Sequence, residues 1–317
     1  MSFCSEVKKE ISLTLPEKEC CKKAELSGLI RTAGSLKPAG KGGVGVLIST
    51  GNPSVARHIK ALFDNIYDID CTVSVANKGG RVSRKRYELN IAPSQEIKDI
   101  LIELGILISV DGLISISKGI SDNLKTKCCR KNYLKGLFLG AGSIADPNRS
   151  YHFDMSFPNQ TVATDARRLM NTFTGIKAGV SSRRDKYVVY LKSAEQIKDV
   201  LGIIDANRHY LEYENVRFMR DMRNSANRIS NCDSANISRL IQAVDTQMVA
   251  IKKIEKHAGL DSLPSKLRDT AIIRKENPEA SMSEMALLFD PPVSKSTVAS
   301  RLKKIEVISI ELEKLLN

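Results

Sequence analysis

The sequence predicts an α+β protein in which two pseudo-symmetric αββαββα halves are followed by an all-α domain. The first observation is an internal repeat: residues 20–35 (CCKKAELSGLIRTAGS) and 128–143 (CCRKNYLKGLFLGAGS) agree at the cysteine pair, two basic residues, two leucines, a glycine and the closing Gly-Ser. The same order of predicted elements follows each copy, and residues 267–309 carry helical patterns only. A repeat of this kind defines the architecture, because each copy is one structural unit.

The first half is predicted to cover residues 1–110. Its strands are predicted from short β-branched runs bounded by turn residues, and its helices from apolar residues at helical spacing. The predicted elements after the repeated stretch are a strand at 44–50, a helix from Asn52-Pro53, strands at 71–76 and 84–91 around Gly79-Gly80, and a helix over 94–107 with an apolar face of Ile97, Ile100, Leu101 and Leu104.

The second half is predicted to cover residues 125–206 and repeats that order. The predicted elements are a strand at 151–157, a helix at 161–173, strands at 176–182 and 186–192, and a helix at 193–204. The closing helices share nearly the same letters, QEIKD at 95–99 and EQIKD at 195–199. This second match indicates that the duplication includes the whole unit.

Residues 207–258 are polar and mostly helical in pattern, and we interpret them as a helical linker. Arg217, Arg220 and Arg223 fall on one face of this helix, where they could follow a nucleic-acid backbone. The alternative is a solvated helix in which these arginines pair with neighbouring acids: Glu212, Glu214 and Asp221.

The last segment, residues 259–317, predicts three helices. The first covers about 265–276, a capping box at Ser281–Glu284 starts the second, and Ser294 caps the third after the break at Asp290-Pro291-Pro292. A core face of Val298, Leu302 and Ile305 leaves hydroxyl and basic side chains on the other side of the third helix. The pattern is typical of a helix-turn-helix, whose second helix enters the DNA major groove; the alternative is a three-helix bundle without a ligand. The predicted DNA-binding residues are Ser294, Lys295, Ser296, Thr297, Ser300, Arg301, Lys303 and Lys304.

The charge also favours a polyanionic partner. The net charge is +13; residues 1–206 carry 31 Lys/Arg against 21 Asp/Glu, and residues 207–317 carry 18 against 15. Two basic clusters occupy matching places in the last hairpin of each half, so we interpret them as a weaker phosphate-facing surface rather than as two solvated faces. The clusters comprise Arg81, Arg84, Lys85 and Arg86 in the first half and Arg183, Arg184 and Lys186 in the second.

The seven cysteines include no C-x-x-C spacing. Each vicinal pair, Cys20-Cys21 and Cys128-Cys129, makes a poor zinc clamp or disulfide by itself, so we interpret these residues as small buried hydrophobes and expect no metal and no cofactor. There is no run of about eighteen apolar residues, and residues 1–10 lack the apolar stretch of a signal peptide. We expect a cytoplasmic, nucleoid-associated protein with no membrane partner and no small-molecule substrate.

The repeated helices, LSGLIRTAG (26–34) and LKGLFLGAG (134–142), resemble the LAGLIDADG helices of homing endonucleases. The resemblance implies two helices packed at a pseudo-twofold axis through glycine and two sheets that form a saddle over DNA. In that family an acid before the final glycine binds the metal ions for cleavage, but here those positions are Ala33 and Ala141, and the other motif acid is Arg31 in one copy and Leu139 in the other. The sequence therefore predicts a saddle without catalytic residues, hence no enzyme.

A degenerate saddle followed by a helix-turn-helix resembles the WhiA family over almost the whole chain. The supporting stretches are residues 137–155, 227–239, 259–269 and 294–305. The resemblance implies a bacterial, sequence-specific regulator of transcription that acts in cell division, chromosome segregation and, in spore formers, sporulation. Its implied partners are double-stranded DNA at promoters and in the nucleoid, together with other transcription regulators.

Five hypotheses stay open at the level of sequence. The chain could be a regulator that uses both DNA-binding parts, or a structural nucleoid protein. It could be a nuclease that uses unrecognised acids, or a maturase-like RNA binder. In a further alternative, the saddle is a protein-interaction scaffold and DNA is bound only by the C-terminal segment.

Overall fold

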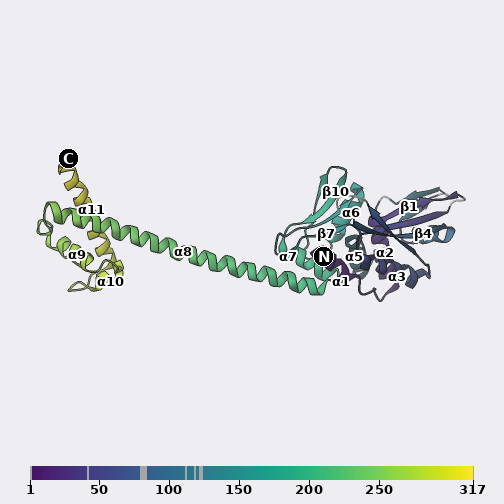
Figure 1. Cartoon of the computed structure of the whole chain (residues 1–317), viewed down its shortest axis with the longest axis horizontal. Coiled ribbons are helices and arrows are strands. Elements are labelled where there is room, and N and C mark those ends of the chain that lie inside the picture. Colours follow the sequence, from purple (N-terminus) through teal and green to yellow (C-terminus); the bar gives the residue numbers. More distant parts are fainter. Residues whose placement is uncertain are drawn as a thin grey trace. The chain divides into compact units, whose positions relative to one another are not determined.

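The computed structural model describes residues 2–40, 43–78, 84–110, 113–117, 119–120 and 124–316. The chain forms two compact units, Met1–Arg220 and Asp221–Asn317 (Figure 1). The first unit contains both halves of the repeat, and the second contains the C-terminal helices. The predicted α+β class, with two like halves followed by helices, is confirmed.

The first half is a four-stranded antiparallel sheet with helices packed against one face. Its strand order is β1-β2-β4-β3, and it is followed by a separate hairpin of β5 and β6. Its elements are α1 (Phe3–Ile11), α2 (Glu19–Ala33), β1 (Gly34–Pro38), β2 (Val44–Thr50), α3 (Pro53–Tyr67), β3 (Thr72–Lys78), β4 (Arg84–Ser94), α4 (Gln95–Glu103), β5 (Leu107–Val110) and β6 (Leu113–Ile116).

The second half has the same topology, with strand order β7-β8-β10-β9. Each sheet thus places the strand that directly follows the repeated helix at one edge. This agreement confirms that the sequence repeat is a structural repeat. The elements are α5 (Lys127–Ala141), β7 (Gly142–Ile144), β8 (Phe153–Phe157), α6 (Gln160–Met170), β9 (Gly179–Arg183), β10 (Lys186–Leu191) and α7 (Ala194–Ile203).

The predicted helix over 94–107 is too long. Helix α4 ends at Glu103, because Gly105 adopts a φ of 69° and turns the chain out of the helix. Residues from Leu107 then pair with β6 instead of extending the apolar face of the helix. Sequence patterns also gave no position for α1, for the hairpin β5–β6, or for the edge strands β1 and β7. Both edge strands begin at the glycine that ends the preceding helix, Gly34 or Gly142. Because each strand is short and starts at a glycine, its sequence resembles a turn.

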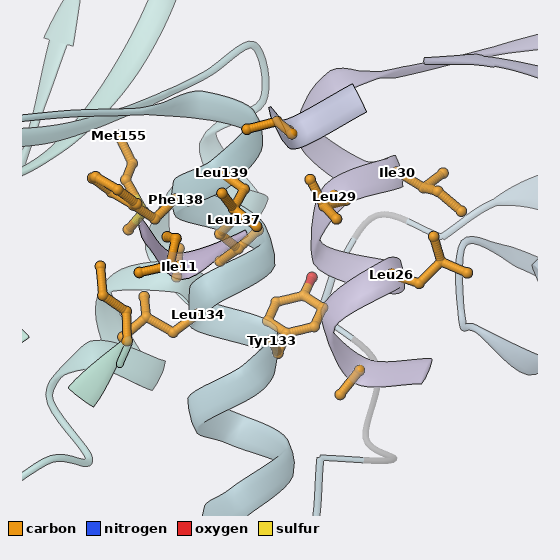
Figure 2. Close-up of a cluster of buried hydrophobic side chains, with 14 of the residues drawn as sticks. Ile11, Leu26, Leu29, Ile30, Tyr133, Leu134, Leu137, Phe138, Leu139 and Met155 are labelled. Atoms are coloured by element: carbon orange, nitrogen blue, oxygen red, sulfur yellow. The ribbon is translucent and has the colours of Figure 1, made fainter. Parts of the chain in front are cut away.

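Helices α2 and α5 pack side by side at the pseudo-twofold axis (Figures 1 and 2). Glycine permits this approach: a Cβ on Gly136 would lie 2.1 Å from the carbonyl oxygen of Glu25, and one on Gly28 would lie 2.5 Å from that of Tyr133. In Figure 2, Leu29 and Leu137 fill the space beside the contact. Both leucines are fully buried, so the apolar core of the unit continues across the two halves.

A buried ionic cluster ties the same two helices to α3. The Glu25 Oε1 atom of α2 lies 2.7 Å from His58 Nε2 and 3.3 Å from Lys135 Nζ of α5. The Lys135 ammonium also donates to the carbonyl oxygen of Thr14 at 3.2 Å. Because the three side chains are almost fully buried, the Glu25 carboxylate and the Lys135 ammonium depend on their partners for stabilisation.

The second unit consists of helices around a small core. Helix α8 (Asn207–His257) passes from the first unit into the second, and α9 (Ser265–Glu276), α10 (Met282–Leu287) and α11 (Lys295–Leu316) follow. Residues Ile251 and Ile254 of α8 pack into the same core as the three later helices. In the part of the chain that the structure describes, no helix has both the length and the apolar character needed to cross a membrane.

Candidate nucleic-acid interface

Helices α10 and α11 form the predicted helix-turn-helix, and local capping defines both starts. The Ser281 hydroxyl accepts from the Glu284 N–H, and the Glu284 carboxylate accepts from the Ser281 N–H, which confirms the capping box. Ser294 accepts a 3.1 Å bond from the Thr297 N–H at the first turn of α11. The break between the helices is Asp290-Pro291-Pro292, as expected, since proline cannot continue a helix.

The predicted core face of α11 is confirmed, because Val298, Leu302 and Ile305 are at most 1% exposed. This packing directs the remaining side chains of its first turns away from the core. Arg301 is half-buried with its guanidinium 5.2 Å from the centre of the Phe289 ring, and Thr297 is half-buried next to the Ser294 hydroxyl. The exposed members of the predicted set are Ser294, Lys295, Ser296, Ser300, Lys303 and Lys304.

One buried cation in this unit was missed at the level of sequence. Arg274 of α9 is 1% exposed and donates to the carbonyl oxygen of Ala280 at 2.7 Å. Burial lowers the pKa of this guanidinium from its usual value. The side chain therefore holds the loop before α10 in place and is not available to a phosphate. Nothing in the local sequence distinguishes Arg274 from an exposed arginine.

The outer face of each sheet, the face turned away from the core and from α2 and α5, carries part of the predicted basic surface. Along β10 the core side chains are Val189 and Leu191, so alternation places Lys186 on the outer face. Arg183 of β9 is the cross-strand partner of Lys186, and both are exposed. Arg184 lies in the turn between them with a φ of 51°. Two cations directly opposite each other repel, which favours an anionic partner.

The first half presents its cations differently. Along β4 the core side chain is Leu89, so Arg86 lies on the outer face and Lys85 on the helix-covered face, near the end of the strand. The predicted cluster is therefore divided between two faces. Arg81 and the side chain of Arg84 lie outside the described residues. The structure adds Lys37 of β1, an exposed cation that shares the outer face and donates to Asn90 Oδ1 at 3.3 Å.

The arginines of α8 do not form one uniform surface. Arg217 lies 3.5 Å from the Glu214 carboxylate, and Arg220 donates to the carbonyl oxygen of Asn148 at 3.0 Å while it covers the Tyr151 ring. Arg223 is exposed. Two of the three arginines thus have partners within the chain, Arg217 in its own helix and Arg220 at Asn148, which agrees in part with the alternative of an ion-paired helix.

The positions that the sequence predicts for the LAGLIDADG acids carry no carboxylate. Ala33 and Ala141 are the last residues of α2 and α5, and Arg31 donates to the carbonyl oxygens of Gly105 and Ser117 at 2.6 and 3.0 Å. Of the nearest acids, Glu25 is buried in the ionic cluster, and the Asp146 carboxylate accepts from the N–H of Asn148 at 2.8 Å. Both acids are held by other groups of the chain.

The vicinal cysteines lie together at the other end of these two helices. Cys21 and Cys129 are buried, as the sequence suggested, but Cys20 is exposed and Cys128 is half-buried. The sulfurs of Cys20, Cys21 and Cys129 all lie within 4.8 Å of one another. The pKa of the Cys128 thiol is lowered to about 7, mainly by the hydrogen bond from the Thr126 hydroxyl and less by the neighbouring Cys21. Burial raises the pKa of Cys21.

Family models match three consecutive parts of the chain. They are the WhiA N-terminal LAGLIDADG-like domain at residues 19–107, the WhiA LAGLIDADG-like domain at 130–223 and the WhiA C-terminal HTH domain at 226–309. The chain belongs to the WhiA family. The duplicated unit and the helix-turn-helix described above are thus the domains of that family.

Relatives match over nearly the full length. The probable cell division protein WhiA of Thermoanaerobacter sp. (strain X514) is 39% identical over 99% of this chain and 98% of its own, and that of Clostridium perfringens (strain 13 / Type A) is 37% identical over 98% of each. A solved structure described as "full-length DUF199/WhiA from Thermatoga maritima" has a TM-score of 0.59 at 22% identity and covers 98% of this chain and 99% of that chain. This likeness supports the fold.

Proposed function

We propose that the protein is a sequence-specific regulator of transcription that binds double-stranded DNA with α11 in the major groove. The observation that carries the proposal is the arrangement of α11: apolar side chains anchor one face, and the first turn presents Ser294, Lys295 and Ser296 to solvent. Hydroxyl and amine groups at the start of a recognition helix contact base edges and phosphates. Arg301 adds a contact if its guanidinium leaves the Phe289 ring.

The saddle contributes a second, weaker contact in this proposal. Arg86 and Lys37 of the first sheet and Arg183 and Lys186 of the second lie on outer faces. Phosphate contacts of this kind raise affinity for every DNA sequence and weaken with salt. Lys85 supplies less of this phosphate contact than the sequence suggested, because it lies on the other face of its sheet. Arg217 and Arg220 also supply less, because they bind groups within the protein.

We further infer that the saddle binds DNA without cleaving it. Hydrolysis of a phosphodiester by a hard metal ion requires carboxylate ligands at the ends of the paired helices. The chain has Ala33 and Ala141 there, and Arg31 is directed to backbone carbonyls. Incubation of supercoiled plasmid with the protein and Mg²⁺ or Mn²⁺ should leave it intact, and nicking would contradict this inference.

The family and the relatives named as cell division proteins support a proposal for the cellular role. We propose a cytoplasmic, nucleoid-associated regulator that supports cell division and chromosome segregation and, in a spore former, sporulation. A genome-wide map of the tagged protein is the direct test. Discrete peaks at promoters support a regulator, whereas uniform coverage of the chromosome favours a structural nucleoid protein.

A binding titration tests the contribution of α11. Lys295→Ala should weaken binding to a mapped site by about 1–3 kcal/mol, or roughly 5- to 150-fold, and relax base preference at one position. Lys252→Ala, an exposed lysine of α8 in the same unit, is the matched control and should leave the affinity unchanged. Equal affinity of Lys295→Ala and the wild-type protein would contradict the assignment, as would a preference for structured RNA over duplex DNA.

The same titration at several salt concentrations tests the saddle. Charge reversal of Arg183 and Lys186 together should lower affinity for all DNA sequences and reduce the slope of log affinity against log salt by about 1.8, because each phosphate contact contributes about 0.9. Lys177→Glu, a reversal at an exposed lysine outside the strands, is the control. An unchanged slope would favour the alternative in which the saddle is a scaffold and only the helix-turn-helix binds DNA.

A further inference from the structure

Four thiols from distant parts of the sequence meet at the first turns of α2 and α5. The sulfurs of Cys20, Cys21 and Cys129 lie within 4.8 Å of one another, and Cys128 precedes Cys129 in the first turn of α5. Cys20 and Cys21 of α2 both contact Cys129 of α5. Each contact joins one half of the repeat to the other. Three sulfurs that are all mutually close converge on a common point, whereas a disulfide brings together only two.

The internal symmetry suits a tetrahedral ligand set. The repeat of 108 positions makes Cys20 equivalent to Cys128 and Cys21 equivalent to Cys129. A tetrahedron has twofold axes that exchange its corners in pairs, so two cysteine pairs related by a pseudo-twofold axis can supply all four corners. Zinc bound to four thiolates has Zn–S bonds of about 2.3 Å, which places the sulfurs about 3.8 Å apart. Three of the sulfurs already lie within 4.8 Å of one another, so only modest side-chain rotations are needed to reach that spacing.

The electrostatic surroundings favour thiolates. The four cysteines lie in the first turns of two helices, Glu19–Ala33 and Lys127–Ala141, where the positive ends of both helix dipoles and unpaired backbone N–H groups are located. Lys18, the N-cap residue of α2, adds a positive charge at the same end of that helix. A divalent ion with four thiolates carries a net charge of −2, which these positive groups offset.

We propose that Cys20, Cys21, Cys128 and Cys129 bind one zinc ion that links the two halves of the saddle. Four protein ligands leave no open coordination position, so the site is structural rather than catalytic. Each thiol that binds as thiolate releases its proton to solvent, and no oxidant or reductant takes part. The exposed Cys20 and an open cleft lined by Lys23, Ser27 and Glu103 give the ion a path of entry.

This site is separate from the positions where the LAGLIDADG acids would bind metal. Cys20 and Ala33 lie near opposite ends of α2, thirteen residues or about 20 Å apart along the helix. The sulfur ligands also select a different ion, because thiolates bind zinc while carboxylates bind magnesium. The proposal therefore does not depend on whether the saddle binds or cleaves DNA.

The test is the metal content of the full chain, purified under reducing conditions after growth with zinc and measured by mass spectrometry of the elements. We expect one zinc ion per chain, and a cobalt-substituted protein with the charge-transfer and d–d absorption of a tetrahedral thiolate site. Cys21→Ser with Cys129→Ser should weaken zinc affinity by at least about 100-fold, since even the outer partners of a ligand are worth about 10–100-fold. Cys71→Ser and Cys232→Ser, one buried and one exposed cysteine outside the cluster, should keep the ion.

Two further measurements keep the proposal falsifiable if the buried serines disturb folding. Cys20→Ser and Cys128→Ser change the more exposed ligands, and each should lower zinc affinity while the circular dichroism spectrum stays that of the wild-type protein. A chelator should lower the melting temperature of the wild-type chain but not that of these variants. A zinc content far below one ion per chain, equal zinc in all variants, or an intact mass that reveals a disulfide among the four cysteines in place of the metal would overturn the proposal.

Discussion

The contact between α2 and α5 makes a quantitative prediction for Gly136→Ala. A Cβ at this position would lie 2.1 Å from the carbonyl oxygen of Glu25 and 3.1 Å from the N–H nitrogen of Leu29. A carbon–oxygen contact in proteins is about 3.3 Å or longer, so the helices must separate by about 1.2 Å. Both contacting atoms belong to helix backbone, so no change of side-chain rotamer can relieve the overlap.

The net cost follows from two opposing effects. Overpacking of a core costs about 1–3 kcal/mol, and contact with rigid backbone places this site at the upper end. Alanine in place of glycine in a helix returns about 1 kcal/mol. We therefore expect Gly136→Ala to lower the free energy of unfolding by about 2 kcal/mol, which is roughly 4–8 °C in melting temperature for a unit of this size.

Scanning calorimetry of the full chain measures this shift. Gly202→Ala is the matched control, because Gly202 also lies in a helix but its added Cβ would meet only the Tyr210 ring, at 3.4 Å. This control should raise the stability by up to about 1 kcal/mol. A Gly136→Ala protein that melts at or above the wild-type temperature would refute the inferred helix contact.

Three further predictions rest on single side chains. Glu25→Ala should lower the free energy of unfolding, measured in urea, by about 3–5 kcal/mol, because it leaves the buried ammonium of Lys135 without its carboxylate. Adding Lys135→Met should recover much of the lost stability. An unchanged stability of the single variant would argue against the ionic cluster. Arg274→Met should lower the stability of the C-terminal unit by about 1–3 kcal/mol, since the Ala280 carbonyl oxygen loses its donor. An unchanged calorimetric profile would contradict the role of Arg274 in holding the loop before α10. In the reduced, metal-free chain, the Cys128 thiol has a pKa of about 7, so its thiolate fraction grows as the pH rises through that value. Alkylation of Cys128, followed by peptide mapping, should therefore accelerate with a midpoint at about pH 7. Thr126→Ala should move that midpoint upward, and an unchanged midpoint would contradict the hydrogen bond from Thr126.

Much of the fold could be predicted from the sequence because its signals are local. Strand β2 was recognisable from VGVLIST and helix α3 from Asn52-Pro53, and both occur with those starts. The first turns of α11 could be predicted in detail, since the Ser294 cap and the apolar spacing of Val298 and Leu302 involve residues within one or two helical turns. The repeat of 108 residues was enough to predict two like halves.

Other features depended on which elements pack together. Lys85 and Arg86 are neighbours in sequence, but the core position of Leu89 places them on opposite faces of the sheet. Arg31 resembles a free cation in the sequence, yet its guanidinium reaches backbone carbonyls more than seventy residues away. In both cases the side chain is positioned by a partner that the local pattern does not contain.

The cysteine pairs show most clearly the difference between what the local sequence determines and what tertiary packing determines. The sequence by itself determined that two identical pairs stand at the same place in a duplicated unit, 108 residues apart. Considered singly, each pair is an unsuitable clamp for a metal ion. Only the tertiary structure brings Cys21 and Cys129 together, because the close contact of α2 and α5 at Gly28 and Gly136 aligns the first turns of both helices. The ligand set exists only after two distant helices have packed around one axis.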